Sequence, residues 1–209
     1  MSRTSEQALL IFTRNPEPGK CKTRLAATIG DSAALAIYTF LLEHTAGIAR
    51  ALENTDKHVY FSNYIGDGPI WEPETFAGHL QLGAGLGARM QQAFEAAFEA
   101  GYKKVVIIGS DLYDLGTEDL KAAFASLDAH QAVVGPATDG GYYLLGLTRM
   151  VPALFRDKAW STDTVLEATL RDLKGIPTFM LPPRTDIDRY EDIAGNPIFV
   201  PFLKNLPND

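Results

Sequence analysis

Short apolar runs typical of buried strands alternate with stretches of helical periodicity along this 209-residue chain. The run KVVIIG at 104–109 gives the strongest strand prediction, because a strand covered on both faces is continuously apolar. Further strands are predicted at 8–13, 58–61, 131–136 and 141–147, short extended pieces at 177–181 and 186–188, and helices at 31–52, 87–100, 117–127 and 162–173. This alternation predicts an α/β sandwich with a mainly parallel sheet. The less regular stretch 136–160 is expected to supply an antiparallel strand and a substrate lid.

Composition narrows the class of protein. The net charge of −7 argues against general nucleic-acid binding, which needs a basic face. The single cysteine, Cys21, excludes a disulfide framework and fits a reducing compartment. No signal peptide is recognised, and no apolar run approaches the ~18 residues that span a bilayer. The sequence therefore predicts one cytoplasmic domain over 1–209, without membrane insertion.

A cationic loop, RNPEPGKCKTR at 14–24, follows the first predicted strand. It carries Arg14, Lys20, Lys22 and Arg24 against one acid, a local charge of +3 in an acidic protein. The loop is not a Walker A motif, because Gly19-Lys20 would need glycine at 14 and serine or threonine at 21. The four cations, with backbone N–H groups near Gly19, are predicted to bind a nucleotide's phosphates. The alternative is a solvated surface loop.

Acidic residues follow two later strands. Asp111 comes directly after KVVIIG, where ligands of parallel sheets bind, and Mg²⁺ takes one or two carboxylates plus phosphate oxygens. Asp111 is therefore predicted to hold a metal, and Asp114 to shape the turn; capping of the next helix is the alternative. Near the C-terminus, Asp186 or Asp188 is expected to give a second metal ligand, a contact to the loop cations or a helix cap.

Two more segments are candidates for substrate binding. In ATDGGYY at 137–143, Asp139 is predicted to act on a hydroxyl as base or acceptor, while Gly140 and Gly141 allow close approach beside Tyr142. A plain hairpin turn is the alternative. In the second segment, Trp160, Ser161 and Thr162 are predicted to contact substrate, although hydroxyl capping of the following helix also explains Ser161 or Thr162.

A glycine-rich stretch, GAGLGA at 83–88, fits the form G-x-G-x-x-A. A solid strand should precede a Rossmann fingerprint, and HLQL at 79–82 is barely one. The stretch is read either as the structural entry to a helix or as a nucleotide contact through Gly87 and Arg89. The scattered histidines show no zinc-ligand spacing.

Together these segments resemble a bacterial family of GT-A-type transferases, the radical-SAM/selenodomain-associated transferases, also known as arsenosugar-biosynthesis glycosyltransferases. The matching segments are FTRNPEPGKCKTRL (12–25), QLGAGLGARM (81–90), GSDLYDL (109–115), GPATDGGYYLLGL (135–147), WST (160–162) and DIDRYEDI (186–193). At 112 and 113 this chain has Leu-Tyr where the family usually has Cys-Pro.

The resemblance implies a three-layer α/β/α sandwich of the nucleotide-diphospho-sugar transferase type, with a Rossmann-like, mainly parallel sheet. It places Lys20, Lys22 and Arg24 at the nucleotide's phosphates. It also places Asp111 at a metal with Asp188 nearby, and the 139–141 turn beside the sugar or acceptor.

The expected function is Mg²⁺- or Mn²⁺-assisted glycosyl transfer from a nucleotide-activated sugar to a small-molecule acceptor, with Asp139 and Lys22 as catalytic residues. Two alternatives stay open: a nucleotidyltransferase that releases pyrophosphate from a nucleoside triphosphate, and a non-catalytic nucleotide- or partner-binding module. The sequence also leaves an oligomer open.

Overall fold

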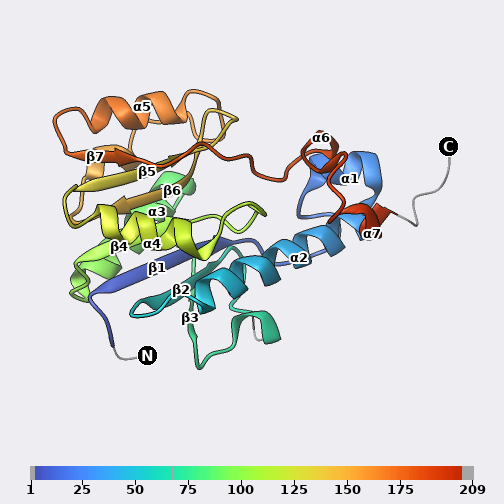
Figure 1. Ribbon diagram of the computed structural model, residues 1–209, viewed down its shortest axis with the longest axis horizontal. Coiled ribbons are helices and arrows are strands. Elements are labelled where there is room, and N and C mark those ends of the chain that lie inside the picture. The colour runs from blue at the N-terminus through green and yellow to red at the C-terminus, as the bar shows by residue number, and fades with distance from the viewer. Residues whose placement is uncertain (1–2, 67, 204–209) are drawn as a thin grey trace.

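A computed structural model describes residues 3–66 and 68–203, which build one seven-stranded sheet (Figure 1). The spatial order of the strands is β3-β2-β1-β4-β6-β5-β7. Their bounds are β1 Gln7–Thr13, β2 Asp56–Phe61, β3 Phe76–Leu80, β4 Lys104–Ile108, β5 Ala132–Pro136, β6 Tyr142–Leu147 and β7 Thr178–Met180. Only β6 runs antiparallel among these strands, between β4 and β5. The mainly parallel sheet and the antiparallel strand in the irregular stretch are both confirmed.

Helices cover both faces of the sheet, which confirms the three-layer sandwich (Figure 1). Their bounds are α1 Thr23–Ile29, α2 Asp31–Arg50, α3 Leu86–Glu99, α4 Thr117–Ser126, α5 Val165–Asp172, α6 Tyr190–Ile193 and α7 Val200–Leu203, with 3₁₀ turns η1 Pro69–Trp71 and η2 Pro152–Phe155. The sheet has an apolar core on each face, and alternate residues of β1 point into one or the other. Leu9 packs with α2 and α4 on one face, whereas Leu10 packs with α3 on the other.

A third apolar cluster fastens the C-terminal segment beside the start of the chain. After β7 the chain crosses the carboxyl edge of the sheet, and α6 and α7 lie next to α1 and the first half of α2 (Figure 1). Phe199 is fully buried there against α1 and α2, in the cluster that contains Leu25, Ile37 and Leu41. This packing brings the acids at 186 and 188 back to the cationic loop.

Three local features differ from the sequence predictions. β3 and α1 were not predicted as a strand and a helix: FAGHL has little apolar alternation and forms an edge strand, and α1 begins at a residue without a capping side chain. The 20-residue helix α2 does pass a length and hydropathy test for a membrane span, contrary to expectation. Its apolar residues, such as Leu41 and Leu42, are buried in the two clusters on either side of it, which identifies α2 as a core helix.

Candidate active site

The candidate site lies at the carboxyl edge of the sheet, where the loops after β1, β4 and β5 meet. Parallel strands place the ends of neighbouring loops together at this edge, and ligands of open α/β sheets bind there. Position 111 follows β4 and position 139 follows β5, while residues 14–22 follow β1. The sheet thus gathers the predicted cations and carboxylates in one region.

Lys22 is the best-defined cation of the site. It precedes α1 in the left-handed conformation, with φ 49° and ψ 43°, a strained state for a side chain of this size. Its side chain is 5% exposed, and its Nζ lies 2.8 Å from Asp111 Oδ2. Burial, the largest single effect, would lower the pKa of Lys22, but the carboxylates of Asp111, Asp188 and Asp186 together outweigh it and the pKa is raised. Lys22 is therefore a fixed ammonium and not a proton acceptor.

The other loop cations are more open. Arg24 donates from Nη1 to Asp188 Oδ2 at 2.7 Å, which joins residues 164 positions apart. Lys20 pairs locally with Glu17 at 2.6 Å, and the Arg14 side chain is exposed. Asp188, predicted as a metal ligand, is thus a partner of the loop cations, one of the roles open to it.

A second carboxylate, Asp186, lies closer to Asp111. The Ile187 N–H donates to the Asp111 carbonyl at 2.9 Å, which fixes the segment beside the β4 loop. The pKa of Asp186 is raised to about 6 by burial and then by the carboxylates of Asp111 and Asp139. Within residues 3–66 and 68–203, no group of three or more histidine, cysteine or acidic side chains is placed to hold a metal. A pair of carboxylates completed by ligand oxygens is the metal site that this arrangement allows.

The Asp139-Gly140-Gly141 turn is both a hairpin turn and a wall of the site. Gly140 has φ +89°, and a Cβ there would lie 2.5 Å from Asp163 Cα, so only glycine fits. Asp139 accepts the Gly141 N–H at Oδ1, 2.9 Å away. Among the described residues no donor reaches Asp139 Oδ2, which leaves this oxygen of an exposed side chain open.

An apolar pocket of about 220 Å³ opens beside this turn. Its walls come from β1, α3, β4, β6 and the 160–165 segment. The side chains that line it include Phe12, Leu86, Met90, Tyr142, Trp160 and Val165, with Asp139, Ser161 and Thr162 among its polar members. The predicted substrate contacts from 139 to 162 are therefore brought together. Ser161 and Thr162 do not cap α5 with their side chains; Ser161 has φ 66°, and the Thr162 hydroxyl donates to the Ala159 carbonyl.

The glycine-rich 83–88 stretch has mainly packing contacts. A Cβ on Gly87 would lie 2.5 Å from Trp160 Nε1 and clash with the Phe155 carbonyl. Arg89 donates to the Gly83 carbonyl at 3.2 Å. These contacts match the structural alternative for this stretch, and they also fix the position of Trp160 in the pocket.

The sequence did not indicate a role for Arg184, which anchors the C-terminal segment that carries Asp186. Its guanidinium donates to Asp119 Oδ1 at 2.7 Å and pairs with Asp114 Oδ2 at 3.1 Å. Its backbone bridges Ala137, beside the DGG turn. Asp114, which was expected to shape a turn, is thus an anchor for the segment that carries Asp186. A lone arginine between two prolines and an acidic run, at PPRTDID, was the only signal in the sequence.

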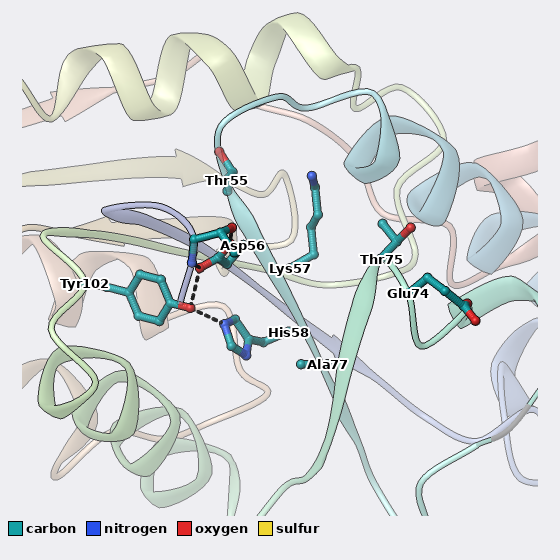
Figure 2. A pocket seen from close by; sticks show the side chains of 9 residues that line it. Thr55, Asp56, Lys57, His58, Glu74, Thr75, Ala77 and Tyr102 are labelled. Carbon is teal, nitrogen blue, oxygen red and sulfur yellow. Dashed lines mark hydrogen bonds between the residues drawn. The ribbon is translucent and has the colours of Figure 1, made fainter. Parts of the chain in front are cut away.

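A larger cavity of about 510 Å³ lies at the opposite edge, at the amino ends of β2 and β3 (Figure 2). Figure 2 shows Tyr102 between Asp56 and His58, while Lys57 points to the other side of the strand. This cavity is far from the cationic loop, at the strand edge where α/β sheets rarely bind ligands. We therefore assign the candidate site to the carboxyl edge.

Comparison with known structures places the fold in one class. A candidate nucleotide-diphospho-sugar transferase from Desulfovibrio desulfuricans G20 is 30% identical, with 93% of this chain and 90% of that chain covered and a TM-score of 0.82. The inositol-1-phosphate CTP transferase from T. maritima is 12% identical over 100% of both chains, with a TM-score of 0.54. Rv0371c from Mycobacterium tuberculosis H37Rv, in complex with manganese, is 15% identical over 90% of this chain and 96% of its own, with a TM-score of 0.52. The fold is that of nucleotide-diphospho-sugar transferases.

The chain belongs to the bacterial family described as "Uncharacterized protein conserved in bacteria (DUF2064)", whose model matches residues 44–162. No curated protein matches the chain.

Proposed function

We propose that this protein is a transferase that binds a nucleotide-activated sugar at the carboxyl edge of its sheet and passes the sugar to a small-molecule acceptor. The observation that carries the proposal is the buried Lys22 ammonium paired with the partly exposed Asp111 carboxylate, 2.8 Å apart, after β1 and β4. Burying the ammonium costs desolvation free energy, so its position at a ligand-binding edge is better explained by function than by stability. The relative that is 30% identical, a candidate nucleotide-diphospho-sugar transferase, supports the same class.

The residues divide into two groups by charge. Lys22 and Arg24 hold the diphosphate and stabilise the charge that develops on it as it leaves. Asp139 accepts the proton of the acceptor hydroxyl through its open Oδ2. The acceptor oxygen forms a bond to the anomeric carbon, the bond from that carbon to the phosphate oxygen breaks, and the nucleoside diphosphate leaves with that electron pair.

A divalent metal fits the residues present. Asp111 and Asp186 would hold Mg²⁺ or Mn²⁺ with oxygens of the substrate's phosphates, since one or two carboxylates with phosphate oxygens are its usual ligands. When bound, the metal supplies Lewis-acid stabilisation of the departing phosphate. Burial, and then the carboxylates of Asp111 and Asp139, raise the pKa of Asp186, and a cation bound beside it would relieve that repulsion. A fold relative in complex with manganese supports this choice.

Nucleotide binding tests the proposal directly. We expect nucleoside diphosphate sugars with Mn²⁺ to raise the Tm of the wild type, and chelation with EDTA to abolish the increase. Lys22→Met should lower the affinity about 10–100-fold, because a hydrogen bond to a charged group is worth about 1.5–3 kcal/mol. Lys121→Met is the matched control, since Lys121 lies on α4, exposed and paired only with Glu118. If no nucleotide binds, or both variants lose affinity equally, the proposal is wrong.

The products separate glycosyl transfer from the alternatives. The likeness to a CTP transferase fold keeps nucleotidyl transfer as the second candidate. That reaction would release pyrophosphate from a nucleoside triphosphate, whereas glycosyl transfer releases a nucleoside diphosphate from a nucleotide sugar. Binding without either product across a broad set of acceptors would identify a non-catalytic nucleotide-binding module.

A further inference from the structure

We infer that the pocket beside Asp139 receives the acceptor, and that this acceptor is a small alcohol with one apolar ring, of the phenol or cyclohexanol class. The inference rests on the proposed function and names its acceptor. It comes from the chemistry of the pocket wall, which neither the family description nor the related structures specify.

The wall is apolar away from its mouth. Phe12 on β1 and Met90 on α3 belong to one apolar cluster, while Tyr142 and Trp160 form an edge-to-face aromatic pair with centroids 6.5 Å apart. The Tyr142 hydroxyl finds only the Met90 thioether, at 3.9 Å, within the part of the chain that the structure describes. A thioether is a weak acceptor, so the Tyr142 hydroxyl is a weakly engaged polar group beside the apolar side chains of Phe12 and Met90.

The pocket has room for a single ring. It is open to solvent on one side and has a volume of about 220 Å³, whereas a closed apolar cavity of roughly 150 Å³ binds benzene. One six-membered ring with a few additional atoms therefore fits the space. A sugar ring of the same size carries several hydroxyl groups, and each one buried without a partner costs about 1–3 kcal/mol.

The polar mouth fixes the direction in which such a molecule enters. Asp139 lies at the pocket and within the electrostatic field of Asp186, on the side of the nucleotide site. With its ring toward Met90, the acceptor presents its hydroxyl to Asp139 Oδ2. The hydroxyl proton then passes to Asp139 as the oxygen bonds to the anomeric carbon and the nucleoside diphosphate departs, as in the proposed reaction.

The two tryptophans of the chain provide a direct test. Trp160 lines the pocket, whereas Trp71 is buried in η1 on the opposite face of the sheet. In ¹H–¹⁵N spectra of the full chain, phenol should shift the Trp160 indole resonance saturably and leave that of Trp71 in place; Trp71→Phe assigns the two peaks. Methyl glucoside is the polar ring control and should shift neither.

A pair of exposed leucines supplies matched variants. Leu86 lines the pocket and is 41% exposed, whereas Leu170 on α5 is 37% exposed and outside it. Leu86→Ser should weaken phenol binding about fivefold, through loss of part of one apolar wall, and Leu170→Ser should leave it unchanged. Since both side chains are partly in solvent, neither change threatens the fold.

The outcomes separate this inference from the proposed function. Phenol binding that survives in Lys22→Met, while nucleotide binding is lost, supports both. Nucleotide binding without a phenol-induced shift of Trp160 overturns the acceptor class alone. A Trp160 shift with methyl glucoside and none with phenol overturns it too, and assigns the pocket to a sugar. An equal loss of phenol affinity in Leu170→Ser shows non-specific binding and has the same consequence.

Discussion

The hydrogen-bond chain at the amino edge of the sheet makes the stability of this protein dependent on the protonation of His58. Tyr102 donates its only proton to Asp56 at 2.8 Å, so His58 Nε2, 3.0 Å from the same hydroxyl, must be the donor in that contact (Figure 2). The remaining nitrogen, Nδ1, then accepts from His79 Nε2 at 3.0 Å. With His79 protonated at Nε2, a proton added at His58 Nδ1 would place two N–H groups against each other. For this pair of tautomers, the folded state requires a neutral His58.

The size and sign of the effect follow from this requirement. Burial first, and then the neighbouring His79, lower the pKa of His58 from 6.5 to about 4. Between these two values the unfolded chain binds more protons than the folded protein, so the free energy of unfolding falls as the pH falls. From pH 7.5 to pH 5.5, His58 lowers the free energy of unfolding by about 1.3 kcal/mol before any reduction for solvent screening. This corresponds to roughly 3–5 °C in Tm for a domain of this length.

Thermal unfolding of wild type and His58→Gln at both pH values measures this contribution. Glutamine keeps a donor and an acceptor near Tyr102 and His79 but does not titrate. Because carboxylates and His79 also respond to pH, the informative quantity is the difference between the two proteins in how far Tm falls on acidification. We expect the variant to lose roughly 3–5 °C less than the wild type. Equal losses would refute the assigned direction of the hydrogen bonds and the requirement for a neutral imidazole.

Two further substitutions test how the site is supported. Gly140→Ala should destabilise the protein by about 1–3 kcal/mol more than Gly175→Ala in urea unfolding. Both glycines have a positive φ, but only a Cβ at position 140 would clash with a neighbour, Asp163. Equal losses of unfolding free energy would show that the turn has room for a side chain. Phe199→Ala should lower the free energy of unfolding by about 3–5 kcal/mol, because it removes a fully buried ring. It should also weaken nucleotide binding, since α7 and Asp188 belong to the same C-terminal segment. A stable variant with unchanged nucleotide affinity would contradict this coupling.

Most of the sheet could be predicted from the sequence because its strands are buried on both faces. β1 and β4 are continuous apolar runs, and the residues that flank them have no competing helical pattern. The edge strand β3 could not be predicted in this way, because its outer residues face solvent and its register is set by β2 alone. Helix α1 escaped prediction for another reason: its start depends on the left-handed backbone of Lys22, which tertiary contacts hold in place.

The residues of the candidate site could be proposed from the sequence, but the ion pairs between them could not. Lys22, Asp111 and Asp139 stand out because each follows a strand, and strand ends are fixed by the fold class. The pairing of Arg24 with Asp188 joins the two ends of the chain and depends on the packing of α6 and α7 against α1. No local pattern encodes that packing. The same holds for Arg184, whose partners lie about 65–70 positions away.

The observed ion pairs change the interpretation of the cationic loop at 14–24 as a phosphate-binding site. Four carboxylates (Asp111, Asp139, Asp186 and Asp188) lie at the site with two paired cations, the buried Lys22 and the more open Arg24, so these six groups have a net charge of −2. A diphosphate brings more negative charge, and each of the two cations already holds a carboxylate partner. Phosphate can compete for Lys22 only if another positive charge takes over Asp111, which is what a divalent metal would do. Under the proposed function, the loop and the acids would therefore work as one unit, in which nucleotide and metal bind together.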